Sequence, residues 1–351
     1  MFAGRKRSSG LIGVDISSSA VKMVELDGSE DSPGVKSYAV QSLPQGAYAE
    51  GNIARIEDVT DAVENCLRRC ASSAGYAAVA LPATAVTTKR FVVPSGLPDD
   101  ELEVRVEAEA NQHIPFPLED VNLDYQVVAE GDEVTDVLII AAKRERIDDQ
   151  VAAVETCGLK VKVVDVESYA LINTMRLFAE DYPAGPDSVV AMVDIGANTV
   201  TVSIFQGEGL LYSRQQPAGG NQLTNDIASH FGMEFEQAEI AKLEGNLGDD
   251  YVPNVLTPFM ENMGLEVSRA LQFFFASTSF GRIDLILLAG GCAILPGLDE
   301  VIGTRTQIPA QVANPFARAQ IGNGINVSSL KVDAPSLVTA CGLALRRFDP
   351  S

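Results

Sequence analysis

The sequence predicts a duplicated α/β fold, with two lobes around a cleft and a small α+β subdomain inserted in the first lobe. Three observations predict this fold. Two segments of the 351-residue chain, LIGVDISSSAVKMV (Leu11–Val24) and VAMVDIGANTVTVS (Val190–Ser203), share a strand, a small-residue turn after an aspartate, and a second strand. An acidic stretch interrupts the first half. The length fits two domains of about 100–200 residues each.

The first half alternates strands and helices after its hairpin. Apolar periodicity predicts a helix over Ile56–Ala74 and strands over Ala77–Pro82 and Thr87–Val93. Acidic residues open a further helix, Asp99–Gln112, because acids are favourable in the first turn, and the Ile-Pro-Phe-Pro run ends it. The remaining elements of this half are the strands Val121–Ala129, Val134–Ala142 and Lys160–Val166, and the helices Arg144–Cys157 and Tyr169–Glu180.

The second half begins after a Pro/Gly linker at Tyr182–Pro186. Its hairpin is followed by the predicted helices Gln222–Phe231, Phe235–Glu244 and Pro258–Ser277, the strand Asp284–Ala289 and the helix Ser336–Phe348. We therefore expect a first core at residues 1–83, an acidic insertion at 84–142 and a second part of the first core at 143–187. A second lobe at 188–333 and a C-terminal helix at 334–351, which returns to the first core, complete the expected organisation.

The charge of the chain is strongly negative and unevenly distributed. There are 26 basic and 48 acidic residues, a net −22, which argues against non-specific binding of nucleic acid or of an anionic lipid surface. Between Pro98 and Asp136, 13 acids and a single base, Arg105, give −12. Such a face can steer a cationic partner segment, although a solvated face that aids solubility is the alternative.

Targeting and cysteine signals indicate a cytoplasmic protein. No apolar segment follows the basic cluster Arg5-Lys6-Arg7, and no run approaches 18 apolar residues, so we expect neither a secretory signal nor a transmembrane segment. The basic cluster itself is either a solvated tail or a weak contact with anionic lipid. Five cysteines without a CxxC pair predict reduced thiols, and two histidines supply little for a metal site or a catalytic triad.

The two aspartate hairpins point to a nucleoside triphosphate with Mg²⁺. Turn N–H groups and hydroxyls can hold phosphate oxygens, carboxylates can hold Mg²⁺ largely through its waters, and Lys22 adds a positive charge. One hairpin alone would be an ordinary turn, but Asp15 and Asp194 occupy equivalent places in both copies. Gly290-Gly291 after a strand is a weaker indication that backbone approaches a ligand there. Glu239 and Lys242, at i and i+3, can either reach a ribose or form an exposed ion pair.

In this order the motifs resemble those of the actin-like ATPase superfamily, whose duplicated core is ribonuclease H-like. The matching segments are two phosphate loops, Asp15–Lys22 and Asp194–Thr199, and an adenosine loop, Gly290–Gly297. Within the superfamily the chain resembles the PilM family of type IV pilus assembly proteins, relatives of the division protein FtsA. The most specific segments are Arg90–Val128 with its Ile-Pro-Phe-Pro turn, DVESYAL (Asp165–Leu171) and GGNQLTNDI (Gly219–Ile227).

The resemblance implies ATP and Mg²⁺ as cofactors, with Mg²⁺ beside Asp15 and Asp194. It implies that the β- and γ-phosphates lie between two sets of residues: Ser17, Ser18, Ser19 and Lys22 on one side, and Gly196, Asn198 and Thr199 on the other. For the remaining positions it implies the following roles: Gly219, Gly220 and Asn221 closing over the nucleotide, Glu239 and Lys242 on the ribose, Gly290 and Gly291 under the base, and Glu167 as the water-activating carboxylate.

One departure from the superfamily pattern predicts slow hydrolysis. The superfamily usually has glycine two residues after the first aspartate, and here the residue is Ser17. A side chain there narrows the approach for phosphate and can require a left-handed backbone from a non-glycine residue.

The resemblance also implies a partner. Family members bind the N-terminal cytoplasmic tail of the bitopic membrane protein PilN in a groove beside the acidic insertion, and tails that flank a membrane helix tend to be basic. The chain would then be a cytoplasmic adaptor, held at the inner membrane through this partner among other pilus assembly platform proteins. A small-molecule kinase on the same fold and an FtsA-like polymer are the alternatives, because one fold hosts several functions, and a homo-oligomer is also open.

Overall fold

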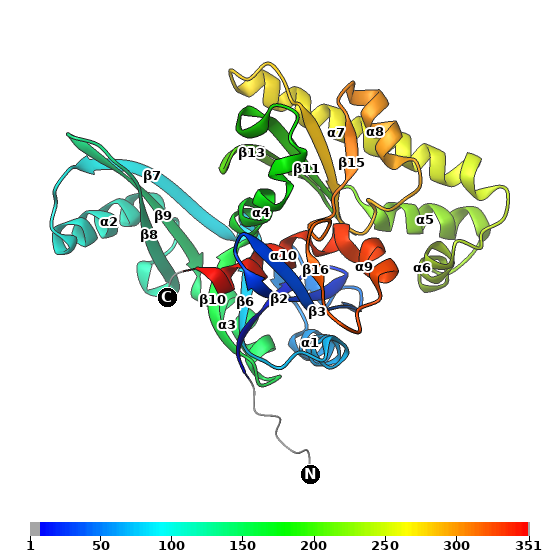
Figure 1. The fold of residues 1–351 in the computed structure, drawn as a ribbon, viewed down its shortest axis with the longest axis horizontal. Coiled ribbons are helices and arrows are strands. Elements are labelled where there is room, and N and C mark those ends of the chain that lie inside the picture. The colour runs from blue at the N-terminus through cyan, green and yellow to red at the C-terminus, as the bar shows by residue number, and fades with distance from the viewer. Residues whose placement is uncertain (1–7, 350–351) are drawn as a thin grey trace, which may run out of the picture.

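The computed structural model describes residues 8–349. These residues form two mixed β-sheets with helices on their faces, and a small three-stranded subdomain projects from the first sheet (Figure 1). This arrangement confirms the predicted duplicated fold with an inserted subdomain.

The first sheet has the strand order β10-β6-β1-β2-β3-β16. β1 pairs antiparallel with β2 and parallel with β6, and β6 pairs parallel with β10. The bounds of these strands are β1 Ser8–Ile16, β2 Ala20–Ser29, β3 Ser32–Ser42, β6 Ala74–Leu81, β10 Lys160–Val166 and β16 Gln320–Ile321. A separate two-stranded hairpin, β4 (Tyr48–Ala49) and β5 (Asn52–Ile53), lies in the same lobe.

The second sheet repeats the topology of the first. Its order is β13-β12-β11-β14-β15, where β11 pairs antiparallel with β12 and parallel with β14. The bounds are β11 Val189–Ile195, β12 Val200–Gln206, β13 Gly209–Gln216, β14 Leu285–Ala289 and β15 Ala310–Val312. The register is also repeated, because Asp15 lies opposite Lys22 and Asp194 lies opposite Thr201.

Helices cover the outer face of each sheet. α1 (Ile56–Cys70) and α3 (Arg144–Glu155) bury apolar side chains against the first sheet. On the second lobe, α7 (Thr257–Ser277) follows a π-helical turn at Val252–Leu256 and packs with α5 (Gly220–Phe231) and α6 (Phe235–Glu244). Within residues 8–349 no helix, α7 included, is long and apolar enough to cross a membrane.

Two helices lie between the sheets. α4 (Glu167–Met175) and α10 (Val338–Leu345) pack against the inner face of the first sheet, while Leu171, Met175 and Val338 also pack against the second. The two helices cross at Gly342, where an added Cβ would lie 1.9 Å from the carbonyl oxygen of Ala170. The Thr174 hydroxyl lies 2.9 Å from the carbonyl oxygen of Val338 on α10, which ties the crossing together.

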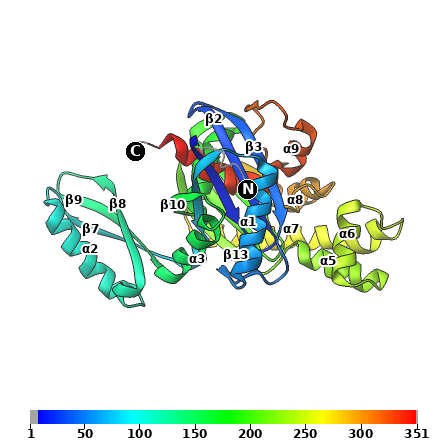
Figure 2. The same cartoon turned by 90° about the horizontal axis from the view of Figure 1, so that it is seen from below.

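The insertion is a three-stranded sheet with the order β7-β9-β8 and one helix. Its elements are β7 (Val86–Pro94), α2 (Asp99–His113), β8 (Val121–Glu130) and β9 (Val134–Lys143). Leu102, Val106 and Ala110 of α2 pack on the sheet, so its acidic side chains face outward. Figure 2 shows this subdomain at the far end of the molecule from α5 and α6.

The structure differs from the sequence-based elements in several places. It adds a third strand to each half, β3 and β13, and two helices, α8 (Leu298–Thr306) and α9 (Val327–Asp333). The predicted helix Tyr169–Glu180 is α4 followed by a 3₁₀ turn from Arg176, and Ser336–Phe348 is α10 flanked by 3₁₀ turns. The chain re-enters the first sheet at β16, which precedes the predicted C-terminal helix. The division of the chain into these five segments stays a prediction.

The close crossing of α4 and α10 predicts a large effect of a single methyl group. Gly342→Ala should lower the free energy of unfolding by about 1–3 kcal/mol, because the added methyl group would overlap the Ala170 carbonyl and push the two helices apart. Gly281→Ala is the matched control, since nothing lies within 4 Å of its added Cβ, and it should change stability by less than about 0.5 kcal/mol. Urea unfolding of both variants measures the difference, and equal stabilities would contradict the crossing.

Candidate functional site

The first hairpin holds an ion pair at its turn. Lys22 of β2 lies opposite Asp15 of β1, and its Nζ is 2.9 Å from Asp15 Oδ2. The same ammonium group donates to the Ser17 hydroxyl at 3.2 Å, and that hydroxyl in turn donates to the Ala20 carbonyl at 2.9 Å. Ser17 is therefore bound within its own turn. Its backbone φ is not positive, so the left-handed strain considered for this position does not occur.

The second hairpin supports the start of α5. The turn from Gly196 to Thr199 closes with a 2.9 Å hydrogen bond from the Gly196 N–H to the Thr199 carbonyl. The backbone N–H groups of Gly220 and Asn221 then donate to the carbonyls of Gly196 and Ala197, at 2.9 and 2.8 Å. The first two N–H groups of α5 are thus already bonded to the turn. The Asn221 side chain also donates to Asn198 Oδ1 at 2.7 Å.

Four charged groups from four elements, β1, β2, β11 and α4, gather between the hairpins. Burial lowers the pKa of Lys22, but the charges of Asp15, Asp194 and Glu167 reverse this effect and hold its pKa above the ordinary value. Burial raises the pKa of Glu167 to about 8, with Asp15 and Asp194 acting in the same direction and Lys22 opposing. Burial also raises the pKa of Asp194. The structure therefore brings together the first-copy and second-copy aspartates, Lys22 and Glu167.

At neutral pH most molecules keep a proton on Glu167 in this arrangement. A protonated carboxyl group cannot accept a proton from water, so Glu167 is not a ready general base in the absence of other charges. A cation bound between the carboxylates would favour the ionised form and restore that capacity.

A second cluster lies at the start of α5 and on α6. Lys242 Nζ lies 2.6 Å from Glu239 Oε2 and 2.8 Å from the hydroxyl of Thr224, which itself lies 2.6 Å from Glu239. The predicted pair at i and i+3 is therefore formed, and the Lys242 side chain is largely buried rather than fully solvated. Thr224 was not predicted as part of this group.

The loop after β14 connects the two clusters. Gly290 has φ +87°, and an added Cβ would lie 2.4 Å from Asp194 Oδ1, so only glycine fits beside that carboxylate. Two residues later, the Cys292 thiol lies 2.6 Å from where a Cβ of Gly220 would be. Burial raises the pKa of Cys292 to about 11, while Lys242 opposes this shift and Glu239 adds to it. Gly291 is exposed, with open space around it.

Sequence reasoning missed Tyr48 and Cys292. The Tyr48 hydroxyl is buried and makes no hydrogen bond within residues 8–349. Burial raises the pKa of Tyr48, and the charges of Glu167 and Asp15 raise it further. Tyr48 lies in a connecting segment, shortly after Pro44-Gln45-Gly46, whose sequence does not indicate a binding site. Cys292 could have been noticed only because it directly follows the Gly290-Gly291 pair.

The donor set suits a magnesium–nucleotide complex better than a bare metal. Within the described part of the chain, no group of three or more His, Cys, Asp or Glu side chains is arranged to hold a metal by itself. Mg²⁺ commonly uses one or two carboxylates together with phosphate oxygens and waters, which is what Asp15 and Asp194 would offer. The glycines at 219, 220 and 290 let backbone approach closely at the same place.

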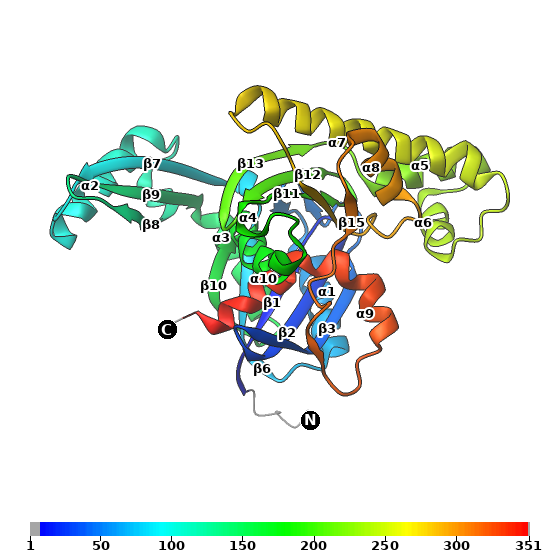
Figure 3. The ribbon, with the colours of Figure 1, turned by 45° about the horizontal axis from the view of Figure 1, so that its top comes forward.

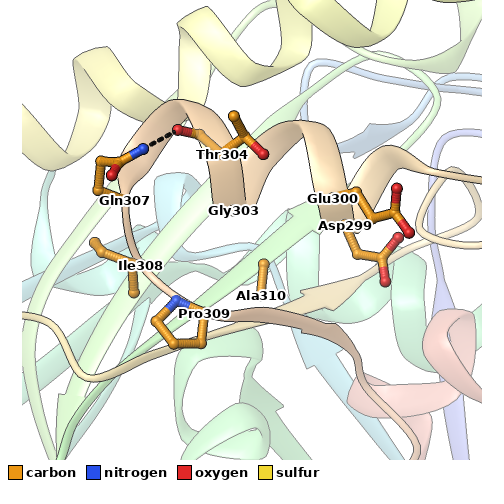
Figure 4. A pocket seen from close by; sticks show the side chains of 8 residues that line it. All are labelled: Asp299, Glu300, Gly303, Thr304, Gln307, Ile308, Pro309 and Ala310. Atoms are coloured by element: carbon orange, nitrogen blue, oxygen red, sulfur yellow. Dashed lines mark hydrogen bonds between the residues drawn. The ribbon is translucent and has the colours of Figure 1, made fainter.

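An open hollow of about 610 Å³ elsewhere on the second lobe does not belong to this site. It lies between α8 and β15, and Figure 4 shows its lining of Asp299, Glu300, Gly303, Thr304, Gln307, Ile308, Pro309 and Ala310. None of the predicted site residues lines it.

Comparison with known proteins places these features in a family context. Residues 13–348 match the family model described as type IV pilus assembly protein PilM. The cell division protein FtsA of Bacillus subtilis (strain 168) is 22% identical over 359 residues, which cover 87% of this chain and 78% of that protein.

Solved structures show the same fold. A chain of a PilM–PilN type IV pilus biogenesis complex superposes with a TM-score of 0.79 and 28% identity, over 98% of this chain and 100% of that one. The ethanolamine utilization protein EutJ from Carboxydothermus hydrogenoformans superposes with a TM-score of 0.56 and 18% identity, over 95% of this chain and 88% of that one.

The raised pKa of Glu167 predicts a pH dependence of stability. Its folded-state pKa of about 8 lies above the ordinary 4.5, so the folded state holds more protons than the unfolded state between these values. The free energy of unfolding should therefore fall through this group as pH rises across that window. Glu167→Gln cannot ionise, so it should unfold at a higher temperature than wild type above about pH 8, with little difference near about pH 5.

Thermal unfolding of the nucleotide-free protein at both pH values measures this effect. Glu244→Gln, at an exposed position, is the control and should follow the wild type at each pH. If Glu167→Gln also follows the wild type, the carboxyl group is not held in the proposed environment.

Proposed function

This chain belongs to the family of the type IV pilus assembly protein PilM, and we propose that it is an ATP-binding adaptor of the pilus assembly platform. It binds ATP with Mg²⁺ between its two hairpin turns, and its acidic insertion binds the N-terminal cytoplasmic tail of PilN. The observation that carries the nucleotide proposal is the gathering of Lys22, Asp15, Asp194 and Glu167 from both halves of the duplicated fold.

The charge of this group supports a cation together with phosphates. Three carboxylates and one ammonium group sum to −2 when all are ionised, which a divalent cation would neutralise. Asp15 and Asp194 would hold Mg²⁺, which would supply that neutralisation and offset the charge of the phosphates. Lys22 is held in place by Asp15 and Ser17, so its ammonium group is already oriented at the turn.

The second cluster supports binding of the nucleoside part. Glu239 and Lys242 lie beside the start of α5, and both carry polar atoms that can bond ribose hydroxyls. Since they now bond to each other and to Thr224, a ribose would have to compete with these contacts. Gly219 and Gly220 let the start of α5 pack directly on the second turn, because an added Cβ at Gly219 would lie 2.6 Å from the carbonyl oxygens of Gly196 and Ala197.

Slow hydrolysis is the expected enzymatic behaviour. Ser17 places a side chain where the superfamily usually has none, and its hydroxyl bonds within its own turn. Glu167 is the carboxylate best placed to orient water, but its raised pKa leaves it protonated until a cation binds. We therefore propose that nucleotide occupancy, rather than rapid turnover, sets the state of the protein.

The insertion supports binding of a cationic tail. Glu103 and Glu107 are exposed on the outward face of α2, away from the sheet. Phe116 of the Ile-Pro-Phe-Pro turn is 38% exposed, and Lys143 at the end of β9 lies 4.3 Å from its ring centroid. An exposed ring on a subdomain that carries many exposed carboxylates can bind both the apolar and the basic residues of an extended tail.

This partner would place the chain in the cytoplasm, peripheral to the inner membrane. Contacts with other platform proteins and self-association are part of the same proposal, and the similarity to FtsA keeps a polymer as the second candidate. Nucleotide-dependent pelleting of the full chain would distinguish the polymer from the adaptor.

Asp194→Asn should weaken binding of ATP·Mg²⁺ about 10- to 100-fold, because it removes one of the two carboxylates offered to the cation. Isothermal titration calorimetry of the full chain with ATP and Mg²⁺ measures the affinity. Asp187→Asn is the matched control, since Asp187 is exposed and precedes the other end of β11. Equal affinities of the two variants would place the nucleotide elsewhere.

Neutralising Glu103, Glu107 and Glu109 together with Phe116→Ala should slow association of a PilN N-terminal peptide and reduce its salt dependence. The physical reason is that exposed carboxylates accelerate the encounter with a basic segment, while the ring contributes to retention.

The matched control neutralises Glu244, Asp249 and Asp250, which are exposed on the second lobe and change the net charge equally. Stopped-flow fluorescence with a labelled peptide gives both rates. Binding that survives the first set unchanged would rule out this face as the peptide site.

A further inference from the structure

β13 forms the outer edge of the second sheet, and no strand within residues 8–349 pairs with its outer side (Figure 3). Unpaired edges can accept a foreign strand, and proteins usually protect them by short length, lysine, proline or other charges. The other outer strands follow this rule. β10 exposes Lys160 and Lys162, and β15 and β16 have only three and two residues. In the insertion, β7 carries Lys89 and Arg90, and β8 carries Asp124 and Glu130.

β13 has an irregularity in its pairing with β12 between Leu210 and Tyr212, but it is long and carries little charge by comparison. It has eight residues, GLLYSRQQ, and its single charge is Arg214. Strands of this length with little charge are suited to pairing with another extended segment.

Aromatic side chains of α7 lie next to this strand. Tyr212 of β13 packs edge-on against Phe274, with ring centroids 5.7 Å apart. The preceding residue, Phe273, is 50% exposed, and the guanidinium carbon of Arg214 lies 3.9 Å from its ring centroid. Residues 270–281 carry no charge, in a chain whose net charge is −22. A large exposed ring beside a free edge can contact a side chain of an added strand.

Arg214 indicates the charge of the missing partner. Nearby Arg269 and Arg282 pair with Glu266 and Asp284, at 2.7 and 3.3 Å. Arg214 stacks on Phe273, and no carboxylate of residues 8–349 lies within ion-pair distance of it. A guanidinium group held in this way suits a carboxylate from outside the chain. A second copy of β13 has no acid to offer, so self-pairing would leave the charge unmatched.

We propose that the outer edge of β13 binds an extended acidic segment of a partner protein by strand addition, with an apolar side chain on Phe273 and a carboxylate on Arg214. This site goes beyond the proposed function, because the PilN tail is expected to be cationic and to bind at the insertion. The protein would then hold two partners of opposite charge on different lobes.

The test uses the full chain and two end-blocked eight-residue peptides, one alternating valine with glutamate and one alternating valine with lysine. Fluorescence anisotropy should show that wild type prefers the glutamate peptide by about tenfold or more, because one close charge pair is formed or lost. Arg214→Glu should reverse the preference. Arg305→Glu, an equal charge change at an exposed position of α8, should leave it unchanged.

Strand addition itself has a separate test. N-methylation of every second residue of the glutamate peptide removes the N–H donors along one of its two edges. Methylation of either the odd or the even residues should therefore abolish binding, whichever set faces β13, and methylation of the other set should preserve it. Phe273→Ser should weaken the parent peptide. Because Phe273 is exposed, unchanged thermal unfolding is expected for this variant.

The proposal is wrong if wild type binds both peptides equally, or if both N-methylated forms bind like the parent. It is also wrong if the peptides do not bind and sedimentation velocity shows a wild-type dimer that Phe273→Ser converts to a monomer. That result would assign the face to a second copy of the chain.

Discussion

The contact on which the rest of the structure depends is the backbone crossing of α4 and α10 at Ala170 and Gly342. The two helices lie between the sheets, so their separation sets how far one hairpin turn is from the other. Glycine at the crossing lets the helices approach to a distance that no side chain permits. Glu167 begins α4, and its position between the hairpins is therefore fixed by the same contact. The charged cluster is a consequence of packing that involves no charged residue.

The negative charge of the chain is of two physical kinds. On the insertion, most carboxylates are solvated, and they repel one another weakly and act at a distance. Between the hairpins, three carboxylates share one ammonium group in a largely buried place. Burial raises the pKa of Glu167 and of Asp194 there, because protonation reduces the free-energy cost of removing these carboxylates from water. The first kind favours a mobile basic partner. The second favours a compact divalent cation, which two of the carboxylates can hold together with phosphate oxygens and waters.

The sequence was sufficient for the architecture and for part of the site. Period-2 strands around small-residue turns predicted both hairpins, and the repeat of Asp15 at Asp194 predicted that they meet. The third strands were missed because β3 begins with Ser-Pro-Gly and β13 mixes apolar and polar residues without clear alternation. Tyr48 and Thr224 could not be predicted, because their roles depend on tertiary surroundings. The Tyr48 hydroxyl is buried without a hydrogen-bond partner in the described residues, and the Thr224 hydroxyl bonds to Glu239. Ser17 shows the reverse, because the residue type suggested a left-handed backbone, whereas its φ is not positive and its hydroxyl bonds to the Ala20 carbonyl.

The repeated register of the two hairpins is symmetric in geometry but not in chemistry. Asp15 faces Lys22, whereas Asp194 faces Thr201, so an ammonium group stands at one pseudo-equivalent position and a neutral hydroxyl at the other. A duplicated cradle with identical halves would accept a chain of phosphates in either orientation. The difference at this pair of positions gives the cradle a direction, since the more negative end of a polyphosphate would be drawn toward Lys22. Together with the Glu239–Lys242 pair on the second lobe, Lys22 would thereby decide which way round an asymmetric ligand enters a nearly symmetric fold.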